Sequence, residues 1–513
     1  MEKPVRSPAA APAPEPRRRP PRPRRPRRLV TPAVLIALGV LAVLGAAGVA
    51  ELTGAPGGVL GAGRPEPIGP SGQSGSRHAV RRGAPGVPGT AAALSALAAG
   101  VPAAPPDLAA LIGDRERRVR AVPGDAGAWA VLGAAYVERA RRTADTADLP
   151  PADKALGTSL RLRPAGNADA LSALAVLANE RRDFRTARAR AEQVLALDPK
   201  RWTAYPPLIT ACTGLGDHKA AQQALDRLTK LDHSPAVRAV TAEVYRDRGW
   251  REDAAAQLAD AVAGAATPAE RAAYVEREGD LAWQRGDLAE ALRDFGAALR
   301  LDAGRPGALA GRARTLASLG RPEDALAAYR RALGDRPRPE LLLEFGELDE
   351  SLGREEQAEE QYDRVRERAG QDAAAGVDDA LVLGRLEADH GDAEAAVRGL
   401  RAEWRLRPGT AVADALGWAL HRAGQDEEAL TFATTATEAA KGGGVRDALY
   451  EYHRGAIEQA LELPGAARRH LRQALRTAPA FSPRWAPEAR TALDALGEPP
   501  VTEAPPGVEL SVR

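Results

Sequence analysis

Residues 286–298 read GDLAEALRDFGAA, and residues 320–332 read GRPEDALAAYRRA. Each segment begins with a glycine, has an alanine five residues later, and continues with an aromatic residue and another alanine. Because residues four and seven positions apart share one face of a helix, Ala291, Phe295 and Ala298 predict a buried helical stripe. Glycine suits the left-handed turn that ends a preceding helix. Each segment therefore predicts a turn followed by an amphipathic helix.

The glycine–alanine pair recurs along the chain at intervals of 33 to 38 residues. The pairs are Gly216/Ala221, Gly249/Ala254, Gly286/Ala291, Gly320/Ala325, Gly353/Ala358, Gly391/Ala396 and Gly424/Ala429. Proline, which cannot continue a helix, closes several periods, at Pro199, Pro337, Pro408 and Pro479. One helical hairpin per period follows, and the low aromatic content of 4% agrees with close packing of small residues. The sequence therefore predicts an all-α repeat protein.

An opening motif of the first unit and its continuation stand at Trp129, Leu132, Gly133, Tyr136, Ala152, Leu156 and Pro164, with an insertion of seven residues between the helices. At these positions the chain resembles the tetratricopeptide repeat family. The resemblance implies a right-handed superhelix, or α-solenoid, of about ten helical hairpins over residues 107–496. The alternative, a HEAT or armadillo stack, has about 40 to 47 residues per unit, which is longer than these intervals.

The ten units are expected to end near Pro164, Pro199, His233, Thr267, Ala303, Pro337, Gly370, Pro408, Lys441 and Pro479. A helix over residues 107–121 is expected to cap the first unit. A helix over residues 483–496 is expected to cover the last one. Residues 497–513 are polar and contain proline, which predicts a disordered tail.

Three segments precede the repeats. Residues 1–28 are rich in proline and arginine and predict a disordered segment. Residues 29–50 contain 22 positions without a charge, enough for one transmembrane helix. Because arginines precede this helix, we expect the N-terminus in the cytoplasm and the repeats outside the cell membrane. Residues 51–105 are rich in Gly, Pro and Ala and predict a linker.

Two other interpretations of residues 29–50 stay open. Gly48, Val49 and Ala50 resemble a signal-peptide cleavage site, in which case the protein is secreted after cleavage. The segment is also compatible with an alanine-rich helix of a soluble protein. The length of the uncharged run favours a retained anchor. The abundance of Ala, Gly, Pro and Arg suggests a bacterial source.

Composition argues against several functions. The first 28 residues carry ten basic and two acidic side chains, so the rest of the chain has a formal charge of −6, which is unfavourable for nucleic acid. Cys212 is the single cysteine and is expected to be a buried, inert thiol. No two histidines stand three or four residues apart, and the common catalytic motifs are absent from the sequence. We therefore expect no enzyme activity, metal, cofactor or small-molecule substrate.

In the family, the first helix of each pair lines a concave surface that receives peptides or partner helices. Placed by the glycine–alanine register, the predicted groove residues are Glu276, Asp280, Trp283, Arg314, Glu344, Glu347, Glu350, Arg385, Asp414, Trp418, His421, Tyr452 and His453. Trp283 and Trp418 either contact the partner or complete the core between units. Trp129 is expected in the core. The glutamate row at 344, 347 and 350 is either a solvated helix face or a site for a basic partner.

These features favour a membrane-anchored, non-catalytic scaffold that binds proteins or peptides through the groove. The alternative is an accessory or regulatory subunit of an envelope enzyme or transport system. The identity of the partner is unknown from the sequence.

Overall fold

The computed structural model describes residues 88–334, 336–439 and 444–498. Within these ranges the regular structure consists of 23 α-helices and two short 3-10 helices, without a strand. The predicted all-α fold is therefore confirmed for this part of the chain. The predicted transmembrane helix and the segment before it lie outside the described residues, as do most of the predicted linker and most of the predicted C-terminal tail. Within the described ranges, no helix combines the length and the hydropathy needed to span a membrane.

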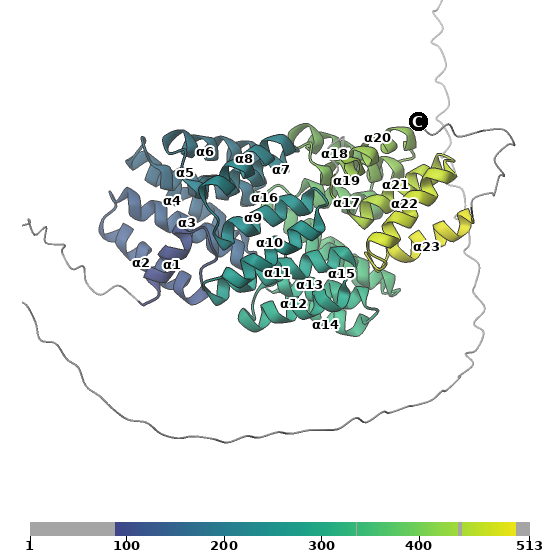
Figure 1. Ribbon diagram of the computed structural model, residues 1–513, viewed down its shortest axis with the longest axis horizontal. Coiled ribbons are helices and arrows are strands. Elements are labelled where there is room, and N and C mark those ends of the chain that lie inside the picture. Colours follow the sequence, from purple (N-terminus) through teal and green to yellow (C-terminus); the bar gives the residue numbers. More distant parts are fainter. Residues whose placement is uncertain (1–87, 335, 440–443, 499–513) are drawn as a thin grey trace, which may run out of the picture. The chain divides into compact units, whose positions relative to one another are not determined.

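Twenty helices form ten successive pairs. The pairs are α3 (Ala126–Thr143) with α4 (Leu149–Leu162), α5 (Ala168–Glu180) with α6 (Phe184–Leu197), α7 (Tyr205–Gly214) with α8 (His218–Leu231), α9 (Pro235–Asp247) with α10 (Arg251–Gly264), α11 (Pro268–Arg285) with α12 (Leu288–Leu301), α13 (Pro306–Ser318) with α14 (Pro322–Leu333), α15 (Pro339–Ser351) with α16 (Glu355–Ala374), α17 (Ala380–His390) with α18 (Ala393–Leu406), α19 (Thr410–Arg422) with α20 (Asp426–Thr437), and α21 (Ala448–Ala460) with α22 (Pro464–Thr477). Each pair packs on the next in chain order, so the pairs form a helical solenoid (Figure 1). The predicted number of ten hairpins is confirmed.

Additional helices cover both ends of the stack. Helix α2 (Pro105–Ala121) packs on α3, and α23 (Trp485–Leu496) packs on α22, close to the two capping helices that were expected. Helix α1 (Thr90–Ala98) lies inside the range that the sequence analysis predicted as linker, so that prediction is wrong for residues 90–98. The segment is rich in alanine and leucine, which favour helix, and α1 packs on α2. The 3-10 helices are η1 (Thr146–Asp148) and η2 (Trp202–Ala204).

The turn inside each pair is left-handed in most units. Six of the seven repeat glycines have positive φ, for example 70° at Gly216, whereas Gly391 has φ of −140°. Arg182 and Glu462 occupy the same place in the α5–α6 and α21–α22 turns, with φ of 60° and 57°. Side chains rarely adopt this conformation because Cβ approaches the backbone, at a cost of roughly 1–2 kcal/mol. Arg182 and Glu462 are therefore locally strained.

Small residues on the first helices receive large residues from the second helices. Phe295 of α12 is fully buried, and it lies against Gly279 of α11 and Gly311 of α13. A Cβ atom at Gly279 would lie 2.9 Å from the Phe295 ring, and one at Gly311 would lie 2.3 Å from it. Since both distances are shorter than a van der Waals contact, the ring fills the space that the two glycines leave free. One aromatic side chain thus joins two successive pairs.

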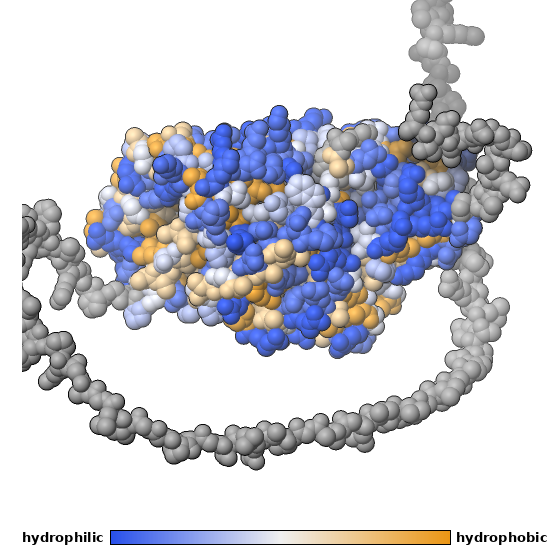
Figure 2. All heavy atoms as spheres, viewed as in Figure 1, coloured by the Kyte–Doolittle hydropathy of each residue, from blue (hydrophilic) through white to orange (hydrophobic). Residues whose placement is uncertain are grey.

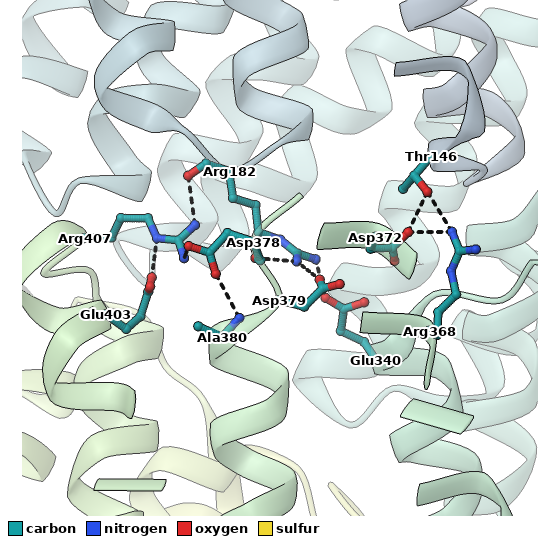
Figure 3. Close-up of polar contacts among 10 residues, drawn as sticks. All are labelled: Thr146, Arg182, Glu340, Arg368, Asp372, Asp378, Asp379, Ala380, Glu403 and Arg407. Atoms are coloured by element: carbon teal, nitrogen blue, oxygen red, sulfur yellow. Dashed lines mark hydrogen bonds and ion pairs between the residues drawn. The ribbon is translucent and has the colours of Figure 1, made fainter. Parts of the chain in front are cut away.

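Turns of the early pairs also contact connections of much later pairs. Arg182 forms ion pairs with Asp379 and Glu340 (Figure 3). Its Nη1 donates to the backbone oxygen of Asp378 at 2.9 Å, and its own backbone oxygen accepts a hydrogen bond from Arg407 at 2.8 Å. These contacts join residues that are more than 150 positions apart in the sequence.

The same contact continues on both sides of Arg182. Thr146 Oγ1 donates to Asp372 at 2.5 Å and accepts from Arg368 at 2.8 Å. Three glycines with positive φ lie close to later connections. A Cβ atom at Gly216 would lie 2.3 Å from Pro408, and one at Gly249 would lie 2.6 Å from Gly444. A Cβ atom at Gly286 would lie 3.1 Å from Pro479. We call this set of contacts the inter-turn contact. It shows that the solenoid curves until its later pairs lie against its earlier ones.

The surface seen in Figure 2 is mainly hydrophilic, and its apolar side chains are divided into small separate patches. Scattered patches of this kind are ordinary for a protein surface and do not by themselves mark a binding site.

Candidate functional site on the first helices

The structure places the predicted groove residues of α11, α13 and α15 next to one another. Glu276 is paired with Arg305, and Arg314 Nε lies 3.1 Å from Glu344 Oε2. The Arg314 guanidinium also lies over the ring of Trp283, 4.8 Å from its centroid. Ion pairs and a cation–π contact thus connect the first helices of three successive pairs.

Trp283 is partly exposed and contributes to the core between units. Its ring packs against the cluster around Phe295, and its Nε1 donates to Ser318 Oγ at 3.1 Å. We call the predicted groove residues of α11, α13 and α15 the polar row. The face of the Trp283 ring that lies under Arg314 belongs to this row. Trp129, which was expected in the core, is also only partly buried and donates from Nε1 to the backbone oxygen of Pro123 at 2.9 Å.

The glutamate row on α15 is not a uniformly solvated face. Glu350 lies 2.8 Å from Arg484 and accepts a hydrogen bond from Tyr362 at 3.1 Å. Arg484 Nη1 also donates to His390 Nε2 at 2.8 Å. Burial, together with the nearby positive charge of Arg484, lowers the pKa of His390 to about 4, so the ring is neutral and can accept this bond.

Four predicted groove residues are buried. Their exposed fractions are 1% for Asp414, 5% for Trp418, 4% for Tyr452 and 5% for His453. His453 Nδ1 lies 2.9 Å from Asp414 Oδ1, and the His453 ring stacks on Trp418. These side chains are therefore not available as an exposed surface, and for Trp418 the structure favours the core alternative. His421, by contrast, is partly exposed and lies 2.5 Å from Asp426.

The reason for this burial is the segment that leads into α23. Phe481 and Trp485 join the same hydrophobic cluster as Trp418 and Tyr452. The Trp485 ring meets Trp418 edge to face with centroids 5.4 Å apart, and it lies 5.7 Å from Tyr452. The C-terminal cap thus covers the first helices of the last two pairs, which the repeat register could not reveal.

Two predicted groove carboxylates remain without a partner. Asp280 and Glu347 are partly exposed, and neither has a hydrogen bond or an ion pair with any described residue. Burial raises the pKa of Asp280 to about 6, opposed by the charge of Arg314. Burial, reinforced by the charge of Asp389, raises the pKa of Glu347 to about 8. Neither carboxylate is used to stabilise the fold. Arg385, the remaining predicted residue, is also partly exposed and lies near Glu347.

We expect Glu347→Gln to stabilise the protein at pH above 8 and to leave it unchanged near pH 4. The folded state keeps the Glu347 proton between about pH 4.5 and pH 8, where the unfolded state loses it, so stability falls as pH rises through this window. Glutamine carries no charge, so the substitution removes this loss of stability. The expected gain is on the order of 3 kcal/mol, less than the full pKa shift would give, because the side chain is partly exposed. Thermal unfolding across this pH range measures it. Glu356→Gln, at an exposed position of α16, is the control. An equal change in thermal stability for both substitutions would contradict the raised pKa of Glu347.

Sequence reasoning missed the residues of the inter-turn contact and the cap. Arg182 stands 34 residues before Gly216 and has Ala187 five residues after it, so extending the glycine–alanine register by one period would have found its position. Nothing local distinguishes Arg407 or Arg484 from other arginines of the chain. Cys212 is buried, as predicted, and burial raises the pKa of its thiol. In the described ranges, no three His, Cys, Asp or Glu side chains converge to hold a metal ion.

Comparison with protein families matches two models described as tetratricopeptide repeat. One matches residues 276–341 and 311–375, and the other matches residues 178–244. These segments are similar to tetratricopeptide repeats. The matched segments include part of α11 and all of α13 and α15, which carry Asp280, Trp283, Arg314 and Glu347. No curated protein sequence matches the chain.

Several solved structures have a similar helical repeat fold. The human IFIT1 dimer with PPP-AAAA is 14% identical, with 61% of this chain and 73% of that chain covered and a TM-score of 0.43. A tetratricopeptide repeat protein from Parabacteroides merdae is 19% identical, with 51% and 98% covered and a TM-score of 0.31. Yeast Tom70 is 14% identical, with 72% and 95% covered and a TM-score of 0.33. All three identities are below 25% and all three TM-scores are below 0.5, so these structures assign no function to this chain.

Proposed function

We propose that this protein is a non-catalytic scaffold that binds proteins or peptides along α11, α13, α15 and α17, the first helices of four successive pairs. Stacked helical repeats provide extended surfaces that proteins use to bind other proteins. The observation that supports this proposal most directly is the polar row in which Asp280 and Glu347 have no partner of their own. The unpaired carboxyl groups of Asp280, near Arg314, and of Glu347, near Arg385, can form hydrogen bonds with a bound chain. The aromatic ring of Trp283 supplies contact area.

The proposal includes an anchor in the cell membrane at residues 29–50. The 22 uncharged positions of this segment and the arginines before it support a single-pass helix with a cytoplasmic N-terminus. The repeats then act outside the cytoplasm, where they gather partner proteins at the membrane surface.

The experiment is site-specific photo-crosslinking in intact cells. A photo-reactive amino acid replaces Trp283, Glu347 or, as a control, the exposed Arg300 of α12. We expect the same partner protein to be cross-linked from positions 283 and 347 and not from position 300. Protease added to the same cells is expected to digest the repeats and to spare residues 1–28.

Either of two results would contradict the proposal. Equal cross-linking from position 300 would mean that the first helices are not the binding surface, and full protection from protease would refute the orientation. If the cross-linked partner is an enzyme or transporter whose activity falls in the Trp283→Ala variant, the protein is an accessory subunit rather than a general scaffold.

A further inference from the structure

A cleft of about 870 Å³ lies between the first helical pair and the connections of later pairs. One wall is formed by the end of α3 and by η1, which belongs to the insertion that the sequence shows in the first unit. The opposite wall is formed by residues 304–307, 309–310, 331–334, 336–338 and 341. The volume is in the range of ordinary ligand pockets.

The described residues that line this cleft include seven arginines and four carboxylates. Part of the positive charge is balanced within the protein: Arg139 is paired with Asp148, and Arg305 is paired with Glu276. Arg141 is paired with Glu138, and Arg336 lies 3.6 Å from Asp145. The side chains of Arg331 and Arg338 are exposed and have neither a hydrogen bond nor an ion pair with any described residue. The excess of positive charge at the cleft therefore comes from the two free guanidinium groups of Arg331 and Arg338.

Arg142 is a second and independent sign of a ligand site, because two of its buried hydrogen-bond donors lack an acceptor. Its side chain is only 7% exposed and is paired with Asp302 through Nη2. Its Nε and Nη1 atoms are buried and lack an acceptor among the described residues. Buried donors without an acceptor are costly, and a charge in such surroundings is weakly screened. Arg142, which lines the cleft, therefore offers two buried N–H donors that the carboxylate oxygens of an occupant can satisfy.

The surroundings of the arginines favour a peptide as this occupant. Leu309, Leu333 and Leu341 line the cleft among the charged groups, so it offers apolar contact as well as positive charge. Arginine binds carboxylates through two parallel hydrogen bonds. Outside its first 28 residues the chain carries a formal charge of −6, which disfavours a long nucleic acid but not a short acidic segment.

We propose that the cleft binds an acidic segment of a partner protein, in which carboxylate and apolar side chains alternate. The inference rests on the proposed scaffold function and names the chemistry of one partner. Arg331 and Arg338 bind the carboxylates, and the leucines contact the apolar side chains.

The test uses the purified full-length chain and a fluorescein-labelled decapeptide of alternating glutamate and leucine, followed by fluorescence anisotropy. We expect binding of this peptide to weaken at raised salt, and to weaken by about tenfold or more in the Arg331→Glu, Arg338→Glu double variant. The matched control is the Arg300→Glu, Arg312→Glu variant, which changes two exposed arginines outside the cleft. All substituted positions are exposed, and circular dichroism verifies that both variants stay folded.

Three results would overturn the inference. One is equal binding of a decapeptide of alternating lysine and leucine, and another is unchanged binding of the acidic peptide by the Arg331→Glu, Arg338→Glu variant. The third is that an oligothymidylate binds in a manner that depends on Arg331 and Arg338, whereas the acidic peptide does not bind. This result would assign the cleft to nucleic acid. If the acidic peptide fails while cross-linking from positions 283 and 347 persists, only this inference is wrong and the scaffold function stands.

Discussion

Phe295→Ala is expected to lower the free energy of unfolding by about 3–5 kcal/mol, a typical range for removing a fully buried aromatic ring. Phe295 is 0% exposed and fills the space between Gly279 and Gly311. Because the two glycines have no side chains that could move into the cavity, the space stays largely empty. Urea denaturation followed by circular dichroism measures the loss. Hydrogen exchange of α11 to α13 shows whether the contact between the two pairs opens locally.

The control for this prediction is Leu301→Ala at the end of the same helix. Leu301 is 39% exposed, so its truncation is expected to cost less than about 1 kcal/mol. A similar loss in both variants would show that Phe295 has no special role in joining the pairs.

Arg407→Met is expected to destabilise the protein by about 3–5 kcal/mol, because it leaves a buried carboxylate without its partner. Arg407 is paired with Glu403, whose side chain is 2% exposed, and also lies 2.9 Å from Asp378. Its Nη1 donates to the backbone oxygen of Arg182, so the substitution also weakens the inter-turn contact (Figure 3). Faster hydrogen exchange is expected in the α5–α6 turn as well as in α18.

Two further variants make this prediction specific. Arg398→Met changes an exposed arginine of α18, the helix that Arg407 follows. Arg398 lies 3.6 Å from Asp392, and the substitution is expected to cost no more than about 1 kcal/mol. The double variant Glu403→Leu, Arg407→Met removes both charges and is expected to regain much of the lost stability. If the double variant is as unstable as Arg407→Met alone, the loss does not come from the unpaired Glu403 carboxylate.

Much of the fold could be predicted because the evidence is local. The spacing of Ala291, Phe295 and Ala298 predicts a helix with one buried face, and a glycine before it predicts the turn. Contacts between successive pairs repeat with the same register, so the number of pairs follows from the number of periods. The exception, α1, lies before the repeat begins and has no register to reveal it.

The candidate site could be predicted only in part. The register placed Asp280, Trp283, Arg314 and Glu347 on first helices, and the structure brings them into one row. The same register placed Asp414, Trp418, Tyr452 and His453 in the groove, and these side chains are buried. Phe481 and Trp485 cover them, but neither residue belongs to the repeat pattern.

The amino-acid sequence by itself determined the helical pairs, their number and the small residues at which they pack, because each of these depends on neighbours within about one repeat. Only the tertiary structure decided which first-helix side chains remain exposed and where the arginine-lined cleft lies. The curvature of the stack accumulates over many pairs until Arg182 meets Asp379 and Arg142 meets Asp302. The sum of these small rotations is a property of the whole stack that no single repeat contains.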